Sequence, residues 1–313
     1  MFDIITFGGA VVDAFLDTDV PQKGKDICYL AGSKIAIKNL SFETGGGATN
    51  TAATFANLGL KTGAIIKIGN DTNAQLILKD LKSRKVAFLG KQEPGNTDFS
   101  VILDSKEHNR TILTHKEKSN SIEYKDLQIS KLKTKWFYFA SLDGKSLATQ
   151  KKLTAYAKKN KIKIAYNPSS YLTKKGPSYI KEILKNTDAL ILNNDEAKDL
   201  IPKGDLFKGL HKLGPKIVAI TFGKKGNSVS NGEEILTALP RKVKVVERTG
   251  AGDAFASAFV ASLTRSDSLE AAIIAGSLNA ESVIRIPGAK NGLLDWKGMS
   301  KELRKSKINI IRN

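Results

Sequence analysis

Short apolar runs alternate with helical patterns along most of the 313-residue chain. Nearly continuous apolar runs are typical of strands that are covered on both faces. Six such runs lie at 4–8, 64–68, 136–140, 162–166, 189–192 and 217–221. Helical patterns lie between them at 48–58, 74–83, 146–159, 179–185 and 205–212. This alternation predicts an α/β fold with a doubly wound, mostly parallel sheet and helices on both of its faces.

The last third of the chain has a different pattern. Three short runs at 228–230, 235–238 and 243–246 are typical of antiparallel strands. Two long helical patterns follow, at about 251–264 and 267–284.

Two segments interrupt the alternation and read as β-hairpins. The first spans 17–42, with strands expected at 27–30 and 34–40, and the second spans 96–116, with strands at 99–103 and 110–114. Neither has enough apolar residues for a core of its own. We therefore predict a β lid formed by 17–42 and 96–116, over an α/β nucleotide- and substrate-binding core of 1–16, 43–95 and 117–313. Hairpins without a function are the alternative.

The charge is strongly basic, with 50 Lys and Arg against 31 Asp and Glu and a net charge of +19. Only eight of the basic residues are arginine, the residue that nucleic-acid surfaces favour for bidentate contacts. A solvated lysine-rich surface is therefore the simpler interpretation, and no specific nucleic-acid partner is expected. Binding of a polyanion remains the rival class of function.

Other composition features exclude several classes. The chain has one cysteine, Cys28, and three histidines, too few for an internal disulfide or a Cys/His zinc cluster. It has no apolar stretch near the ~20 residues that span a bilayer, and its start lacks a signal-peptide pattern. The expectation is a cytoplasmic protein without a membrane partner.

The strongest local signal is the run Thr249-Gly250-Ala251-Gly252-Asp253, which opens a helical pattern. Backbone N–H groups of Gly250, Ala251 and Gly252 at a helix start would form an anion site. Asp253 in the first turn has two interpretations: a helix-capping carboxylate, or a general base that accepts a proton beside a phosphoryl group.

A second glycine-rich helix start lies at 45–50. Gly45 and Gly46 would let a small polyol approach the backbone, and Asn50 would offer a hydrogen-bonding amide. Asp13 follows the first predicted strand, where ligands gather in open parallel sheets, and could accept hydrogen bonds from two sugar hydroxyls. A structural role for the glycines and a surface-loop role for Asp13 remain the alternatives.

Two further segments follow predicted strands. Asn193 and Glu196 could order magnesium and its water shell, although a helix-capping box would use the same spacing. Thr221, Gly223 and Gly226 form a glycine-bounded turn that could hold the phosphates or ribose of a nucleotide.

Taken together, these segments resemble the PfkB family of ribokinase-like carbohydrate kinases. The likeness runs from Asp13 to Gly288-Ala289, with 45–50 and 249–255 matching the two family signatures. It implies transfer of the γ-phosphoryl group of ATP to a hydroxyl group of a sugar, usually a primary one, with Asp253 as base. Gly250, Ala251 and Gly252 would form the anion hole, and Asp13, Gly45, Gly46 and Asn50 would hold the acceptor. Glu196 would organise Mg²⁺, while Asn193, Thr221, Gly223, Gly226, Gly288 and Ala289 would lie at the nucleotide.

The chain also departs from the family pattern. Many relatives have an aspartate that helps to bind an activating potassium ion where this chain has Glu247, followed by Arg248. Glu247 is thus a candidate ligand for a monovalent cation, and potassium activation is left open. Ribokinases commonly have lysine at the position of Gly47, so ribose is not assigned as the acceptor.

Three expectations stay open from the sequence. A nucleoside kinase is the alternative within the family, with Tyr29, Ile35, Ile37 or Phe99 of the lid covering a base. A non-catalytic nucleic-acid-binding protein on the same fold is the remote alternative. The resemblance further implies a homodimer that pairs through the lid.

Overall fold

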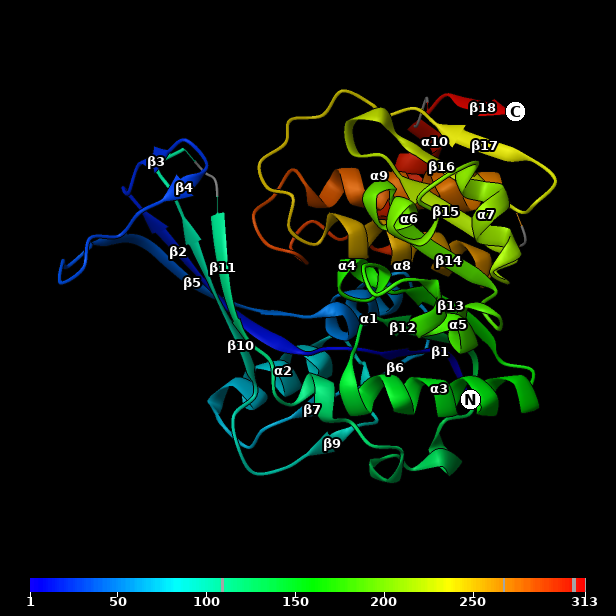
Figure 1. Ribbon diagram of the computed structural model, residues 1–313, viewed down its shortest axis with the longest axis horizontal. Coiled ribbons are helices and arrows are strands. Elements are labelled where there is room, and N and C mark those ends of the chain that lie inside the picture. The colour runs from blue at the N-terminus through cyan, green and yellow to red at the C-terminus, as the bar shows by residue number, and fades with distance from the viewer. Residues whose placement is uncertain (108–109, 267, 306–307, 313) are drawn as a thin grey trace.

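A ten-stranded sheet runs through the larger part of the protein (Figure 1). The computed structural model describes residues 1–107, 110–266, 268–305 and 308–312. Seven neighbouring strands are parallel, in the order β8 (Ala87–Phe88), β6 (Thr62–Ile65), β1 (Phe2–Phe7), β12 (Thr134–Ala140), β13 (Lys163–Asn167), β14 (Ala189–Asn193) and β15 (Ile217–Thr221). Antiparallel strands β16 (Asn227–Ser230), β17 (Ile235–Ala238) and β18 (Ile310–Arg312) extend one edge.

Helices cover both faces of this sheet, which confirms the predicted fold class. One face packs against α1 (Gly47–Asn57), α8 (Ala251–Leu263), α9 (Leu269–Val283) and α10 (Trp296–Lys305). The other face packs against α3 (Gly144–Lys159), α4 (Ser169–Thr173), α5 (Lys181–Leu184), α6 (Asn194–Leu200) and α7 (Leu206–Lys212). Helix α2 (Thr72–Ser83) packs beside α1 in a smaller apolar cluster. The continuous apolar strands follow from this coverage.

A second, four-stranded sheet projects from the core and is called the lid sheet below (Figure 1). Its order is β11 (Arg110–His115), β10 (Asp98–Asp104), β2 (Val11–Thr18) and β5 (Ile37–Gly45). Short strands also form two separate two-stranded sheets. One pairs β3 (Gln22–Lys23) with β4 (Asp26–Ile27), and the other pairs β7 (Lys67–Ile68) with β9 (Lys91–Gln92). Residues 108–109 of the predicted lid, and residue 267 at the start of a predicted helix, lie outside the described residues.

Alternation along these strands gives the lid sheet two different faces. Register places Glu43, Asp13, Ser100 and Thr114 in one row across the four strands, and Asn39, Asp17, Asp104 and Arg110 in a parallel row on the same face. The opposite face carries Phe42, Ala14, Val101 and Leu113 in one row. The first face also carries Phe15, Ile102 and Ile112 between its two polar rows, so it is mixed, whereas the row on the opposite face is apolar.

Two predicted strands are wrong. Residues 28–30 form no strand, because β4 ends at Ile27 and β5 begins only at Ile37. Residues 243–246 also form no strand, since the free edge of β17 pairs with β18 from the chain end. The N–H of Val246 donates instead to the carbonyl of Ile284, at 2.8 Å.

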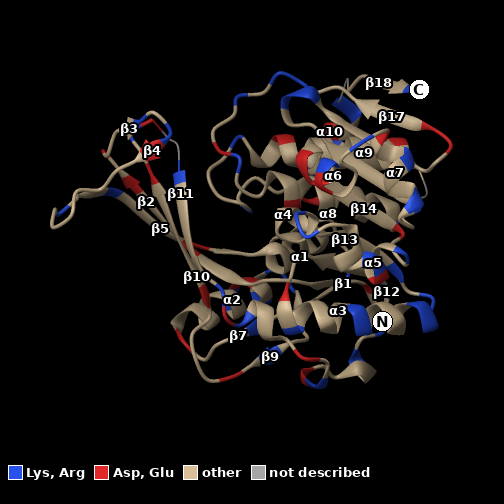
Figure 2. Ribbon diagram, in the orientation of Figure 1, with Lys and Arg blue, Asp and Glu red and all other residues tan. Residues whose placement is uncertain are grey.

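Basic residues are scattered over the core in Figure 2, on α3, α5, α7 and the connecting loops. Among the described residues, no helix has both the length and the apolar composition required to cross a bilayer.

Candidate active site

The starts of helices α1 and α8 meet through one hydrogen bond. Asn50 Nδ2 donates to Asp253 Oδ2 at 2.9 Å, although the two residues are 203 positions apart in the chain. Asn50 is buried and Asp253 is half-buried. Burial raises the pKa of the Asp253 carboxyl, while the Asn50 hydrogen bond partly opposes that rise. A carboxylate with a raised pKa is a stronger proton acceptor at neutral pH.

The capping interpretation of Asp253 is not what the structure shows. The N-cap of α8 is Gly250, and no side chain caps this helix start. Gly250 has a left-handed backbone, with φ of 77°, and a Cβ built there would lie 2.7 Å from three atoms of Ala289. The turn therefore requires glycine.

The backbone N–H groups predicted to bind an anion differ in how accessible they are. The N–H of Ala251 already donates to the Arg248 carbonyl at 3.3 Å. Gly252 lies in the first helical turn, where N–H groups have no partner within the helix, and a Cβ there would meet nothing within 4 Å. Gly252 therefore offers the most accessible backbone for an anion, reinforced by the helix dipole.

A small cavity of about 120 Å³ joins this helix start to the carboxyl ends of the core strands β13, β14 and β15. Gly252 and Asp253 line it together with Asn193, Glu196 and Thr221. The structure thus brings together residues from three of the predicted segments. Gly223 and Gly226 lie beyond Thr221 and do not line this cavity.

Asn193 and Glu196 form the helix-capping box that was the alternative interpretation of their spacing. Asn193 Oδ1 accepts from the Glu196 N–H at 2.9 Å, and Glu196 Oε2 accepts from the Asn193 N–H at 2.9 Å. Both nevertheless line the cavity, and burial raises the pKa of Glu196. Among the described residues no three acidic, His or Cys side chains cluster as metal ligands. These two oxygen-bearing side chains suit Mg²⁺, which retains most of its water shell.

A larger cavity of about 340 Å³ lies beneath the lid sheet. Asp13, Gly46, Ser100, Lys116 and Thr249 are among the residues that line it. Asp13 is half-buried, and burial raises the pKa of its carboxyl. Hydroxyl and amide groups also line this cavity, from Thr114, Ser119, Asn120 and Ser141. This lining suits a ligand with several hydroxyl groups.

Glycine is required where the chain enters α1. Gly46 has φ of 99°, and a Cβ there would lie 2.4 Å from the Gly9 carbonyl oxygen. A Cβ on Gly45 would lie 2.2 Å from Asp13 Oδ2. Both the structural and the ligand-binding interpretations of these glycines fit this arrangement. Asn50 Oδ1, at the same helix start, is buried without a hydrogen-bond partner and could accept a hydrogen bond from a ligand hydroxyl.

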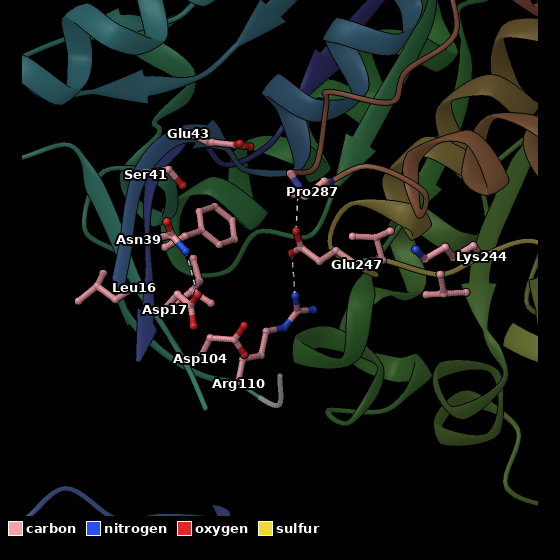
Figure 3. Close-up of a pocket in the computed structure, with 15 residues that line it drawn as sticks. Leu16, Asp17, Asn39, Ser41, Glu43, Asp104, Arg110, Lys244, Glu247 and Pro287 are labelled. Atoms are coloured by element: carbon pink, nitrogen blue, oxygen red, sulfur yellow. Dashed lines mark hydrogen bonds and ion pairs between the residues drawn. The ribbon is translucent and has the colours of Figure 1, made fainter. Parts of the chain in front are cut away.

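A third cavity of about 580 Å³ lies farther out, between the lid sheet and two loops of the core (Figure 3). Glu247 and Gly288 line it from the core side, and Arg110 and Asp17 line it from the lid side. Ile102 lines both this cavity and the cavity of about 340 Å³ beneath the lid sheet. Ala289 is buried against Gly250.

Sequence reasoning missed two charged residues near the site. Arg110 of β11 reaches Glu247 and Thr249 across the outer cavity. Lys290, directly after Ala289, is buried and bonds Asp80 and Thr44, which ties this loop to α2 and β5. Burial lowers the pKa of Lys290, and Asp80 opposes that effect. No local motif marks either residue, because their partners are far away in the chain.

The chain is similar to known carbohydrate kinases. A family model described as pfkB family carbohydrate kinase matches residues 2–296. An ATP-dependent 6-phosphofructokinase of Thermoanaerobacterium thermosaccharolyticum is 27% identical over 301 residues, covering 92% of this chain and 89% of that protein. A ribokinase of Lactococcus lactis subsp. lactis is 27% identical over 287 residues, covering 90% and 92%.

The fold also matches solved structures. The crystal structure of adenosine kinase from Sinorhizobium meliloti superimposes with a TM-score of 0.82 at 23% identity, covering 97% of this chain and 99% of that one. At this level of identity the likeness concerns the fold.

Proposed function

Because the chain belongs to the pfkB family of carbohydrate kinases, we propose that it transfers the γ-phosphoryl group of ATP to a primary hydroxyl group of a sugar. As a family member it is a phosphotransferase that acts on an alcohol group. The observation that carries the proposal is the Asn50–Asp253 hydrogen bond, which joins the predicted acceptor segment to the predicted base.

In this mechanism Asp253 accepts the proton of the acceptor hydroxyl. The hydroxyl oxygen bonds to the γ-phosphorus, and the bond between this phosphorus and the leaving ADP breaks. Asn50 Nδ2 holds the carboxylate in place through Oδ2. Of the predicted donors Gly250, Ala251 and Gly252, the Gly252 N–H would stabilise the charge on the transferred group most directly, because the Ala251 N–H already donates to the Arg248 carbonyl. Burial raises the pKa of Asp253, which makes its carboxylate a stronger proton acceptor.

The nucleotide would lie along the carboxyl ends of β14 and β15. Asn193, Thr221, Gly223 and Gly226 would contact it from one side, and Gly288 and Ala289 from the other. Glu196, helped by Asn193, would hold Mg²⁺ through water. When bound, Mg²⁺ neutralises negative charge on the β- and γ-phosphates.

The acceptor would occupy the cavity of about 340 Å³, which Asp13 and Gly46 line. Gly45 beside Asp13 and Asn50 at the start of α1 do not line this cavity themselves and would complete the acceptor site next to it. A nucleoside is the second candidate, since Ile102, Ile112 and Tyr171 give the same cavity apolar surface for a base. Tyr29, Ile35, Ile37 and Phe99, which the sequence suggested as a shelf, are not among the residues that line it.

Replacement of Asp13 by Asn tests the proposal. ATP turnover should be measured across free sugars, sugar phosphates and nucleosides, and then repeated with the variant on the best acceptor. Loss of a charged hydrogen-bond acceptor should raise the acceptor KM by roughly 10- to 100-fold. The KM for ATP should stay unchanged, because Asp13 does not line the small cavity. Absence of turnover with every acceptor, or an equal rise in both KM values, would contradict the proposal.

We also propose a homodimer that pairs through the apolar face of the lid sheet. Leu40, Phe42 and Leu113 on this face are each more than half exposed. A second copy presents the same apolar face, so pairing about a twofold axis removes both from water. Sedimentation equilibrium should show a dimer, and Phe42→Glu should shift it to monomer. A monomeric wild-type protein would contradict this prediction.

A further inference from the structure

Arg110 connects the lid sheet to the loop that leads into the anion site. Its Nη1 lies 3.0 Å from Glu247 Oε1 and also donates to Thr249 Oγ1. Figure 3 shows the side chain reaching across the outer cavity from β11 toward Glu247. Arg110 and Glu247 are 137 positions apart in the chain. Thr249 directly precedes Gly250, the N-cap of α8, so the contact lies next to the start of this helix.

The Glu247 carboxylate accepts hydrogen bonds from three separate segments of the chain. Its Oε1 accepts from Arg110 and from Thr249 Oγ1, and its Oε2 accepts from the Gly288 N–H at 2.9 Å. Gly288 precedes Ala289, which packs directly against Gly250. One carboxylate therefore holds the lid, the loop before the anion site and the loop behind it.

These contacts do not fit a monovalent cation at the Glu247 carboxylate. Such a cation is held by oxygen atoms that direct their lone pairs toward it. Both Glu247 oxygens already accept hydrogen bonds, and a guanidinium charge lies 3.0 Å from one of them. A second cation at the same oxygen would be repelled by that charge.

We propose that Arg110 is a positioning residue that serves as the internal cation of Glu247, so that a lid arginine orders the anion site in place of bound potassium. The proposal rests on the proposed kinase function. The lid then does more than cover the acceptor. It must lie close to the core so that the Arg110 guanidinium reaches Glu247 and Thr249. The anion site is then complete only when the lid is closed.

Asp104 and Asp17 lie in the same row of the lid sheet as Arg110 and line the same cavity. Lys244 lines it from the core. Arg110 thus has carboxylates on both sides, and Glu247 is the one that lies in the loop before α8.

The first test compares kcat in potassium, sodium and choline chloride at equal ionic strength. The wild-type kcat should be the same in all three salts. Arg110→Met should lose about 10- to 100-fold in kcat, as expected when a catalytic group is misplaced. This variant should also become faster in potassium than in choline, because Glu247 is then free to bind a cation. Arg110→Lys should retain more activity and stay insensitive to potassium, since the charge is kept.

The second test does not depend on turnover. Amide hydrogen exchange in the ligand-free protein should become faster at 249–253 and at 288–289 in Arg110→Met, relative to the core strand at 4–7. The matched control is Lys38→Met, which removes an exposed ion pair with Asp19 elsewhere on the lid and should leave these amides unchanged.

A wild-type enzyme that is faster in potassium than in choline would overturn the proposal. So would exchange at 249–253 in Arg110→Met that matches Lys38→Met. If the wild type phosphorylates no acceptor, the kinase function fails, whereas the exchange comparison still decides whether Arg110 orders the loop.

Discussion

Asp253→Asn is expected to lower kcat by roughly 100-fold or more, because the amide cannot accept the proton of the attacking hydroxyl. The amide is nearly the same size as the carboxyl, so the helix start and the small cavity should be preserved. Nucleotide binding should therefore be retained, as measured by calorimetry. A kcat near the wild-type value would remove Asp253 from the mechanism.

The pH profile gives the same prediction a second readout. Burial raises the pKa of Asp253, and the base acts only when it is deprotonated. Activity should therefore be present above this raised pKa and fall as the pH drops through it. The acidic limb of kcat/KM should lie above about 3.9, the ordinary value for aspartate. If the residual activity of Asp253→Asn falls at the same acidic pH as that of the wild type, the titrating group is not Asp253 but another one, such as Asp13.

A matched control separates the chemical role from a helix-start role. Asp205 caps α7, where its Oδ1 accepts from the Lys208 N–H at 2.9 Å. Asp205→Asn makes the same substitution at a helix start outside the site and should leave kcat unchanged. If both variants changed kcat alike, the effect would come from helix starts in general.

Gly250→Ala is expected to produce the second largest effect. The left-handed backbone costs a non-glycine residue about 1–2 kcal/mol. The new methyl group would also meet backbone atoms of Ala289 at 2.7 Å, so one of the two loops must move. Displacement of the anion site by about 1 Å would lower kcat by roughly 100-fold. Thermal unfolding and steady-state kinetics should show both losses together.

Gly252→Ala is the matched comparison on the same turn. A Cβ at Gly252 meets no protein atom within 4 Å, so the fold should be as stable as the wild type or slightly more stable. Gly252 lines the small cavity, and the methyl group should interfere with a bound phosphate there. Activity should fall without a loss of Tm. Equal melting temperatures for Gly250→Ala and Gly252→Ala would contradict the assignment of strain to Gly250.

Local chemistry accounts for much of what could be predicted. The apolar runs at 189–192 and 217–221 became β14 and β15 because buried parallel strands need apolar side chains on both faces. The glycines before α1 and α8 mark helix starts where a side chain would collide with neighbouring backbone. The capping box at Asn193 and Glu196 is local as well. These features depend on neighbours in the sequence, so their patterns are visible in it.

Partners that are distant in the chain could not be predicted in this way. Residues 243–246 carry a strand pattern, yet β18 from the chain end occupies the edge they would need. The hydrogen bond of Asn50 to Asp253 and the ion pair of Arg110 with Glu247 link residues 203 and 137 positions apart. A sequence states which groups can donate, accept or carry charge. Which of them meet depends on how sheets, helices and lid pack, because burial and pairing arise from contacts that no local pattern encodes.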